Sequence, residues 1–438
     1  MRTPSNGRAV VIGASLAGLL AARALHESFE EVVVLDRDAT LPERPETRRG
    51  VPQSGQVHGL LARGRQELDV LFEGLSPELI GLGAPTCDVQ DEMEWWVDGR
   101  PLAKGPCGMI GLAVSRPLLE FAIRRRVAAL PNVEIRPDHA VTGLVTTPDG
   151  DRVTGVVALS AGEETTLGHV DLVVDASGRG SRARHWLSRL GYPAVEEQRI
   201  EIQLTYASRR YRRDPGQLDG RYGTAIASYP GKLRGGFVLA QENNTWITSV
   251  SGWFGAVPPT DEAGMIEWAE QLDSPDVATI MRTSEPLDEG SLKMRYPAST
   301  RFRYDRIDRF PAGFLVTGDA MCSFNPIYGQ GMTVAALEAT ILGRLLKDGT
   351  DDLAARFYGE TATVLDVPWT TVMANDLRFP DAIGDRSMLD PERGAYLLRL
   401  RAAAADDPEL ARAFLRVTQL IDPPAALFAP SIASRVPA

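Results

Sequence analysis

The sequence predicts an α/β protein in which a strand–helix–strand opening is followed by a separate β-sheet region and a helical C-terminal region. Short apolar strands at residues 8–12 and 31–36 flank an Ala- and Leu-rich helical segment at residues 16–26. Several strand-like segments follow one another within residues 201–255, which predicts a second sheet. From residue 351 onward the pattern is mostly helical. We therefore expect two sheet-based lobes and a helical region.

The remaining elements follow from periodicity and turn residues, in chain order. Residues 39–55 are rich in Pro, Arg and Gly and predict an ordered loop. The later segments are a helix at 58–72, a hairpin at 92–101, an amphipathic helix at 115–130, two hairpin-like runs at 141–159, buried strands at 169–175 and 314–317, and a helix at 332–346. Prolines interrupt the helical C-terminal region, and we expect breaks at Pro368, Pro380, Pro391 and Pro423.

Composition and charge narrow the classes of function. The chain has 438 residues, of which 44% are hydrophobic, and can bury a large core. Its formal net charge is −11, so nucleic-acid binding is not expected. Cys87, Cys107 and Cys322 are widely spaced and form no CxxC pair, which fits a reducing, cytoplasmic location. The five histidines have no metal-ligand spacing, so no metal site is expected.

The N-terminal segment imitates a secretory signal peptide, because a basic start precedes an apolar run at residues 9–22. We interpret it differently, since Gly13 and Gly18 stand where a turn requires them and the run leads into the apolar strand at residues 31–36. No other segment approaches the roughly twenty apolar residues of a membrane span. The sequence therefore predicts a chain without such a span.

The opening segment carries a glycine motif for binding a dinucleotide. In VIGASLAGLL, Gly13 permits the tight turn from strand to helix, Ser15 is small enough for the backbone to approach a pyrophosphate, and Gly18 permits close packing of helix and strand. The helix N-terminus offers free amides to the phosphates. Asp36 ends the second strand, where an acid can accept hydrogen bonds from the adenosine ribose, and Arg37 beside it is counted with this site. These residues alone do not separate FAD from NAD.

A second glycine-containing segment, FLVTGDAMCSFNPIYGQGMTVAALEA, resolves this choice. It resembles the flavin-ribityl motif of the FAD-dependent monooxygenase superfamily that includes the aromatic hydroxylases. The resemblance implies that an Asp contacts the ribityl chain and that a glycine turn approaches the flavin ring. A helix N-terminus aimed at the flavin pyrimidine edge stabilises the negative charge of reduced flavin. The residues that it assigns to FAD are Gly318, Asp319, Pro326, Gly329, Gly331 and Met332.

Three further segments fit the same superfamily. SRPLLEFAIRRRV resembles the helix whose early arginine reaches the FAD pyrophosphate, here Arg116. TRRGVPQSGQVHG contains Arg48, Arg49 and His58, which could meet the flavin or its phosphates, although a solvated loop and a packing histidine are equally good interpretations. LVVDASGRGSRAR departs from the superfamily, because Ser177 stands where the aromatic hydroxylases have an Asp. This departure makes direct reduction by NAD(P)H doubtful and a separate flavin reductase plausible.

The wider pattern, including the C-terminal DVPWTTVMANDLRFPD, is similar to bacterial polyether and terpenoid epoxidases. The resemblance implies transfer of one oxygen atom of O2, through a flavin C4a-hydroperoxide, to an alkene of a polyketide or terpenoid. The flavin carries this chemistry, and no catalytic cluster of side chains is expected. The alternatives are hydroxylation of an aromatic substrate, a flavin-dependent halogenase, and an isoprenoid-reductase-like oxidoreductase. The halogenase is disfavoured because its WxWxIP segment is absent and Lys104 is a poor candidate for its catalytic lysine.

The resemblance and the element order predict a Rossmann-type FAD-binding domain interleaved with a β-sheet substrate domain, plus the C-terminal helical region. We expect the FAD-binding domain to comprise residues 1–60, 110–190 and 295–346, the substrate domain residues 61–109 and 191–294, and the helical region residues 347–438.

The substrate pocket is expected between the flavin and the middle sheet. For each aromatic residue that could line it, packing in the core of the sheet is the favoured interpretation, because aromatic residues commonly fill strands. No carboxylate-binding cluster is evident in the sequence, so an apolar, uncharged and fairly large substrate is expected. The candidate lining residues are Trp95, Trp96, Tyr206, Phe237, Trp253 and Phe254.

Overall fold

A five-stranded parallel sheet forms around the first strand in the computed structural model, which describes residues 6–437. Continuous Val-rich strands, such as β2 with its FEEVVVL sequence, suit a parallel sheet that is covered on both faces. The strand order is β17 (Phe314–Val316), β11 (Leu172–Asp175), β1 (Asn6–Ile12), β2 (Phe29–Leu35) and β7 (Val133–Arg136). Residues 1–5 and 438 of the predicted domain ranges lie outside the described part of the chain.

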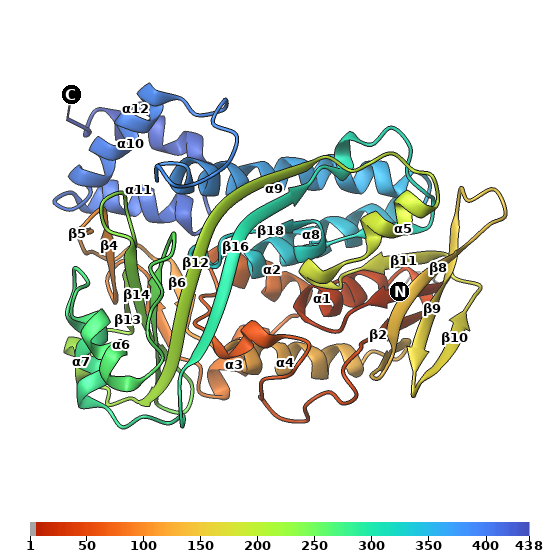
Figure 1. Cartoon of the computed structure of the whole chain (residues 1–438), viewed down its shortest axis with the longest axis horizontal. Coiled ribbons are helices and arrows are strands. Elements are labelled where there is room, and N and C mark those ends of the chain that lie inside the picture. The colour runs from red at the N-terminus through yellow and green to blue at the C-terminus, as the bar shows by residue number, and fades with distance from the viewer. Residues whose placement is uncertain (1–5, 438) are drawn as a thin grey trace.

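Helices pack on this sheet and against one another. Helix α1 (Leu16–Leu25) contacts β1, β2 and β11, and it also packs against α4 (Arg116–Ala128) and α8 (Gly331–Leu345). Helix α8 contacts α2 (Ala62–Leu71) as well. Helices α1 and α8 thus lie side by side in one packed layer (Figure 1).

An eight-stranded sheet stands beside this layer. Its two longest strands, β12 and β16, run diagonally across the molecule in Figure 1 and pair antiparallel. Their register shifts between Glu201 and Leu204, next to Gln203, whose φ is +45°. The strand order is β18 (Cys322–Ser323), β16 (Leu292–Phe302), β12 (Glu197–Arg212), β15 (Thr245–Gly252), β14 (Arg234–Gln241), β13 (Gly223–Ile226), β4 (Met93–Val97) and β5 (Arg100–Pro101).

Smaller elements complete the two lobes. The predicted hairpin at residues 92–101 is present as β4 and β5. A three-stranded antiparallel sheet contains β8 (Ala140–Thr146), β9 (Val153–Ser160) and β10 (Glu163–Leu167), and a two-stranded sheet pairs β3 (Thr86–Asp88) with β6 (Ile110–Leu112). The remaining helices of these lobes are α3 (Leu75–Gly81), α5 (Ala183–Arg189), α6 (Glu262–Ala269) and α7 (Asp276–Thr283). The predicted α/β class is therefore confirmed.

The C-terminal region is helical, as expected, but its first helix is longer than the prolines predict. It contains α9 (Leu353–Asp376), α10 (Pro391–Ala403), α11 (Pro408–Thr418) and α12 (Pro430–Ala433). The expected break at Pro368 is wrong, because α9 continues through it. Leu365, Trp369 and Val372 are buried around this proline, and their packing compensates for the one lost amide hydrogen bond. Pro391, by contrast, occupies the first turn of α10, where it costs no hydrogen bond.

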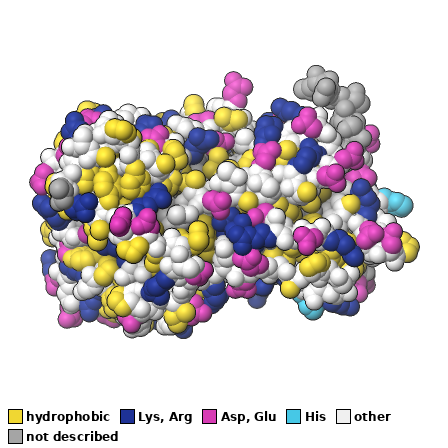
Figure 2. All heavy atoms as spheres, turned by 90° about the horizontal axis from the view of Figure 1, so that it is seen from above, with side chains coloured by type: hydrophobic (Ala, Val, Ile, Leu, Met, Phe, Trp, Pro, Cys, Tyr) yellow, Lys and Arg dark blue, Asp and Glu magenta, His cyan; other side chains and the backbone are white. Residues whose placement is uncertain are grey.

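Helices α10, α11 and α12 lie at the end of the molecule near β4 and β5 (Figure 1). Leu410, Ala411 and Leu415 of α11 share an apolar cluster with Val89 and Leu102 from the first part of the chain. Figure 2 shows hydrophobic side chains gathered on the surface over this end. No helix in residues 6–437 is long and apolar enough to cross a membrane.

Candidate active site

The first glycine turn brings the backbones of β1 and α1 into close contact. Gly13 has a φ of +101°, and its N–H donates to the Leu35 carbonyl over 2.7 Å. A Cβ at Gly18 would lie 1.8 Å from the Gly13 carbonyl oxygen, so only glycine permits this approach. Ser15 is the N-cap residue of α1, and its hydroxyl does not cap the helix. The first amides of α1 therefore suit the pyrophosphate of a dinucleotide.

Arg48 lies at the centre of a buried charge cluster beside this turn. Its Nη1 atom lies 3.2 Å from Asp36 Oδ1 and 2.6 Å from Asp38 Oδ2, and its Nε atom lies 2.9 Å from Glu120 Oε1. Asp36 also accepts the Ala14 N–H over 2.7 Å. Burial lowers the pKa of Arg48, but the carboxylates of Glu120 and Asp36 raise it above its ordinary value. Arg48 thus fixes the carboxylate that is predicted to bind the ribose.

Glu120 links this cluster to the arginine predicted to reach the pyrophosphate. Its Oε2 atom accepts the Ser15 hydroxyl over 3.1 Å and lies 3.3 Å from Arg116 Nη2. Arg116 also donates to Ser15 Oγ over 2.9 Å. Burial raises the pKa of Glu120, but Arg116 and Arg48 bring it below its ordinary value. Sequence reasoning missed Glu120, although its position one helical turn after Arg116 was an available signal.

The other basic residues predicted near FAD lie differently. Arg37 and Arg49 are exposed, and the structure does not bring them into the buried cluster around Arg48. His58 Nδ1 lies 3.0 Å from the Gln56 carbonyl oxygen. Burial, with the nearby Arg116 guanidinium, lowers the pKa of His58 to about 4, so this imidazole is neutral at pH 7.

The second glycine segment approaches α1 from β17. Gly318 has a φ of +65°, and a Cβ there would lie 2.7 Å from Ala17 Cβ. Glu338 of α8 accepts the Thr317 hydroxyl over 2.6 Å and the Gly318 N–H over 2.7 Å. Burial raises the pKa of Glu338 to about 7. Sequence reasoning missed Glu338, whose only signal is an acidic residue within an apolar helix.

Asp319 lies near two guanidinium groups. It is half-buried, and burial raises its pKa whereas Arg179 and Arg116 lower it. Arg179 also lies over the ring of Tyr296, with 5.0 Å between the guanidinium carbon and the ring centroid. Because Arg116 contacts Ser15 as well, the structure brings residues of both glycine segments to one place.

The loop before α8 presents an open helix N-terminus. Gly329 has a φ of +65°, which an L side chain rarely adopts. Helix α8 begins at Gly331, and the side chain of its N-cap residue Gln330 makes no capping hydrogen bond. Within residues 6–437, the buried Gln330 Oε1 atom has no hydrogen-bond partner. Met332 is buried in the first turn, and Pro326 is exposed at the start of the loop. The free amides and the unpartnered amide oxygen fit the pyrimidine edge of a flavin, which both accepts and donates hydrogen bonds.

A buried carboxyl group from α9 holds this loop. Asp376 is fully buried and accepts the Tyr328 hydroxyl over 2.6 Å and the Asn325 side-chain amide over 3.1 Å. Burial raises the pKa of Asp376 to about 7, although both hydrogen bonds lower it. Sequence reasoning missed this contact, because an Asp at the end of a helix gives no sign of burial. The C-terminal region thus positions the loop predicted to contact flavin.

We predict that Asp376 makes the folded protein less stable as the pH rises. Its pKa is about 7 in the folded protein and near 3.8 when exposed, so between these pH values the folded protein retains a proton that the unfolded chain releases. The stabilisation is complete below about pH 4 and is lost as the pH rises through 7. In urea unfolding between pH 5 and 8, the free energy of unfolding of Asp376→Asn should therefore decline less steeply than that of the native protein, by up to about 1.4 kcal/mol per pH unit.

The matched control is Asp385→Asn, since Asp385 is exposed and its pKa is lowered by the Ser387 backbone amide. This control should keep the native slope. Equal slopes for the native protein and Asp376→Asn would contradict the prediction. Burial also raises the pKa of Glu338, so Glu338 contributes to the pH dependence of the unfolding free energy that remains in Asp376→Asn.

Ser177, the departure from the superfamily pattern, supports a buried carboxyl group. Its N–H donates to Asp175 Oδ1 over 2.9 Å, and its hydroxyl donates to the same oxygen over 2.5 Å. Ser181 donates to Asp175 Oδ2 over 2.6 Å. Asp175 is fully buried at the end of β11, and burial raises its pKa. Ser177 therefore caps the strand end beside Gly13, to which its Cα is close.

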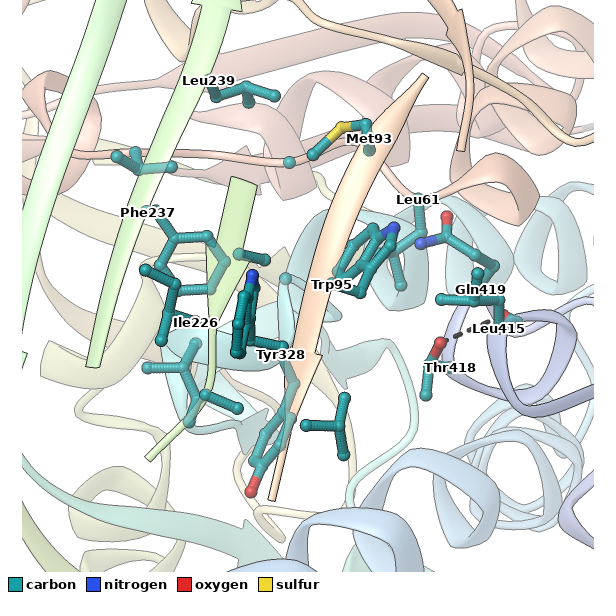
Figure 3. Close-up of a pocket in the computed structure, with 18 of the residues that line it drawn as sticks. Leu61, Met93, Trp95, Ile226, Phe237, Leu239, Tyr328, Leu415, Thr418 and Gln419 are labelled. Atoms are coloured by element: carbon teal, nitrogen blue, oxygen red, sulfur yellow. Dashed lines mark hydrogen bonds between the residues drawn. The ribbon is translucent and has the colours of Figure 1, made fainter. Parts of the chain in front are cut away.

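A cavity of about 270 Å³ lies between the eight-stranded sheet, the loop before α8 and the C-terminal helices. Figure 3 shows side chains of β4, β13 and β14 on one side of it and of α11 on the other. Four of the predicted aromatic residues line it: Trp95, Trp96, Tyr206 and Phe237. Burial raises the pKa of Tyr206 to about 12, so its hydroxyl stays protonated.

Trp253 and Phe254, the other two candidate lining residues, are not among the residues that line this cavity. Strand β15 ends at Gly252, and the two aromatic residues that follow pack behind the cavity wall. Trp253 is fully buried and stacks on Phe379, with 4.6 Å between the ring centroids. Phe254 lies 5.7 Å from the same ring. Of these three aromatic residues, Phe379 lines the cavity. Trp253 and Phe254 pack against Phe379 and hold it in position.

Comparisons with known proteins agree with this geometry. The sequence matches the family described as FAD binding domain over residues 7–354. It is 36% identical over 432 residues to Protein Rv3254 of Mycobacterium tuberculosis, covering 94% of this chain and 90% of that protein. It is 26% identical over 439 residues to kynurenine 3-monooxygenase of Salinispora arenicola, covering 92% and 84%. The structure of p-nitrophenol 4-monooxygenase PnpA from Pseudomonas putida has a TM-score of 0.67 at 17% identity, covering 96% of this chain and 100% of that one. The chain therefore belongs to the FAD binding domain family and is an FAD-dependent monooxygenase.

Proposed function

We propose that this monooxygenase epoxidises an alkene in a polyketide or terpenoid. The observation that carries the proposal is the cavity between the sheet and the loop before α8, because its walls are largely apolar and aromatic. Such a cavity binds a hydrophobic carbon skeleton by removing its surface from water. The resemblance of the sequence to polyether and terpenoid epoxidases supports the same substrate class.

The reaction consumes an alkene, O2, NAD(P)H and a proton, and it yields an epoxide, NAD(P)⁺ and water. FAD, when bound, would supply the redox chemistry by which electrons that originate from NAD(P)H activate O2 for transfer of one oxygen atom. The side chains of Trp95 and Phe237 hold the substrate and exclude water from this step. Tyr206 remains a neutral hydroxyl in the wall, so the lining does not place a phenolate next to the reacting alkene.

FAD would be held by the groups already described. The amides at the start of α1 and Arg116 would bind its pyrophosphate, and Asp36 would accept hydrogen bonds from the adenosine ribose. The amides at the start of α8 would stabilise negative charge on the flavin pyrimidine.

Hydroxylation of an aromatic substrate is the second candidate. It is supported by the match to kynurenine 3-monooxygenase and by the aromatic walls, against which an arene stacks well. A halogenase is less well supported, because Lys104 is exposed and none of the residues lining the cavity is a lysine.

The test is a reaction of the purified holoenzyme with matched terpenoid alkenes and arenes, with NADH or NADPH and an added flavin reductase as the electron source. Under O2 we expect an epoxide whose oxygen comes from O2, and no product under argon. Product that persists under argon would eliminate the oxygenase proposal, and conversion of the arenes alone would favour hydroxylation.

The electron route is tested in the same preparation by anaerobic reduction. We propose that the flavin receives electrons from a separate flavin reductase, because Ser177 replaces the acidic residue of the aromatic hydroxylases. Bleaching of the flavin absorbance should then be slow with NADH or NADPH alone and fast after a flavin reductase is added. Rapid stoichiometric bleaching by either nucleotide alone would refute the need for a partner.

A further inference from the structure

Three charged side chains meet at the part of the cavity wall formed by the C-terminal region. Asp98 lies in the turn between β4 and β5, Arg378 follows α9, and Arg401 belongs to α10. Arg378 Nη2 lies 2.8 Å from Asp98 Oδ1, and Arg401 Nε lies 2.8 Å from Asp98 Oδ2. All three residues line the cavity. They are far apart in sequence, which is why no such cluster is evident there.

The cluster has more positive than negative charge. One carboxylate faces two guanidinium groups, and arginine side chains remain protonated in proteins. Arg401 is only 6% exposed. Burial lowers its pKa, Asp98 raises it, and Arg378 lowers it again, so the two cations repel each other across their shared partner.

Neighbouring groups do not neutralise the excess positive charge of this cluster. Arg401 Nη1 donates to the neutral Asn375 side chain over 3.2 Å. Tyr328 faces both arginines, but its pKa is raised well above the ordinary value and it stays neutral. Behind it, Asp376 has a pKa of about 7 and carries only part of a charge at neutral pH. A buried, unbalanced guanidinium group gains most from an anionic hydrogen-bond acceptor.

We propose that this cluster binds an anionic oxygen group of the substrate, most simply a carboxylate, so that the substrate is an amphipathic acid rather than a hydrocarbon. The apolar part of such a molecule lies against Trp95 and Phe237 in the same cavity. A planar carboxylate accepts two parallel hydrogen bonds from one guanidinium group, which fixes the orientation of the carbon chain. The inference rests on the proposed function only in taking this cavity as the substrate site.

The test is equilibrium dialysis of the oxidised holoenzyme against geranate and geraniol at pH 7, without reductant. The two probes share one branched ten-carbon diene and differ at the head group. We expect geranate to bind about tenfold more tightly than geraniol, as expected for hydrogen bonds between charged partners. Equal affinities, tighter binding of geraniol, or binding of neither probe would overturn the proposal.

Variants separate recognition from a merely structural ion pair. Arg378→Gln should bring the affinity ratio near one, and Arg378→Lys should restore part of the preference. The control is Thr418→Val, which changes the same cavity wall at a hydroxyl that donates to the Leu415 carbonyl and should keep the native ratio. An unchanged ratio in Arg378→Gln would contradict the assignment. The absorbance of bound FAD reports whether each variant is folded.

The variant Asp98→Asn best distinguishes substrate recognition by the two arginines from a merely structural role of the cluster. Asp98 competes with the substrate for both arginines, so its neutral isostere should bind geranate several-fold more tightly than the native protein does. If the cluster only ties the C-terminal helices to the hairpin, the same change weakens binding of both probes alike, and the proposal fails. No oxygen transfer occurs in these measurements, so a failed epoxidation leaves them valid, and a failed preference leaves the epoxidation test standing.

Discussion

Gly18→Ala should abolish FAD binding and destabilise the protein by about 3 kcal/mol, the upper part of the usual range for overpacking. Alanine is ordinarily better than glycine inside a helix by about 1 kcal/mol. Here the added Cβ would lie 1.8 Å from the Gly13 carbonyl oxygen. The backbone at Gly13 and at Gly18 cannot move apart without opening the turn between β1 and α1. The pyrophosphate would then lose the amides of the helix N-terminus. The measurements are urea unfolding of the apoprotein and the flavin content of the purified protein.

Gly359→Ala is the matched control, since Gly359 lies within α9 and a Cβ there would have no neighbour within 4 Å. This variant should retain FAD and gain stability of up to about 1 kcal/mol. A Gly18→Ala protein that remains yellow and equally stable would show that the turn does not require this close backbone approach.

Arg48→Met should cost about 3–5 kcal/mol of stability, as expected when one partner of a buried ion pair is removed. Methionine fills a similar volume but leaves the carboxylates of Asp36, Asp38 and Glu120 without the guanidinium group that bridges them. Arg116 still faces Glu120, so the two aspartates carry most of the penalty. The loss should be measured by urea unfolding at pH 7.

Arg49→Gln provides the comparison, because Arg49 is adjacent in sequence but exposed. Its unfolding free energy should stay within about 0.5 kcal/mol of the native value. FAD affinity should fall strongly in Arg48→Met and not in Arg49→Gln. Equal effects of the two substitutions would argue against the buried cluster around Asp36.

Much of the region predicted to bind FAD can be predicted from the sequence, because its backbone turns and strands depend on residues that are close in sequence. Glycine is required where backbones approach closely or φ is positive, as at Gly13, Gly18 and Gly318. Such positions can be recognised from a short sequence motif. The strands around them are continuous apolar runs, which indicate a parallel sheet. The same local logic identifies Trp95 and Trp96, which precede the turn of a hairpin.

The other cavity wall could not be predicted, because its residues come together only in three dimensions. Asp376 and Arg401 lie in α9 and α10, and their burial depends on contacts with the distant loop residue Tyr328 and the hairpin residue Asp98. Pro368 shows the same limitation, since packing around α9 outweighs the intrinsic cost of a proline within a helix. The sequence around Trp253 does not distinguish an aromatic residue that faces a cavity from one that packs in the core.

The length of α9 has a consequence for how this enzyme can diversify. The match to the FAD binding domain family ends at residue 354, whereas the helical wall of the cavity is built from residues 371–419. Substitutions in the last helices can therefore change which substrate fits the cavity without changing the residues predicted to bind FAD. Asp376 limits this freedom, because it lies beyond the matched residues and accepts a hydrogen bond from Tyr328, which lies within them. Exchange of C-terminal segments between relatives should succeed only when this contact and the pairing of Asp98 with Arg378 and Arg401 are retained.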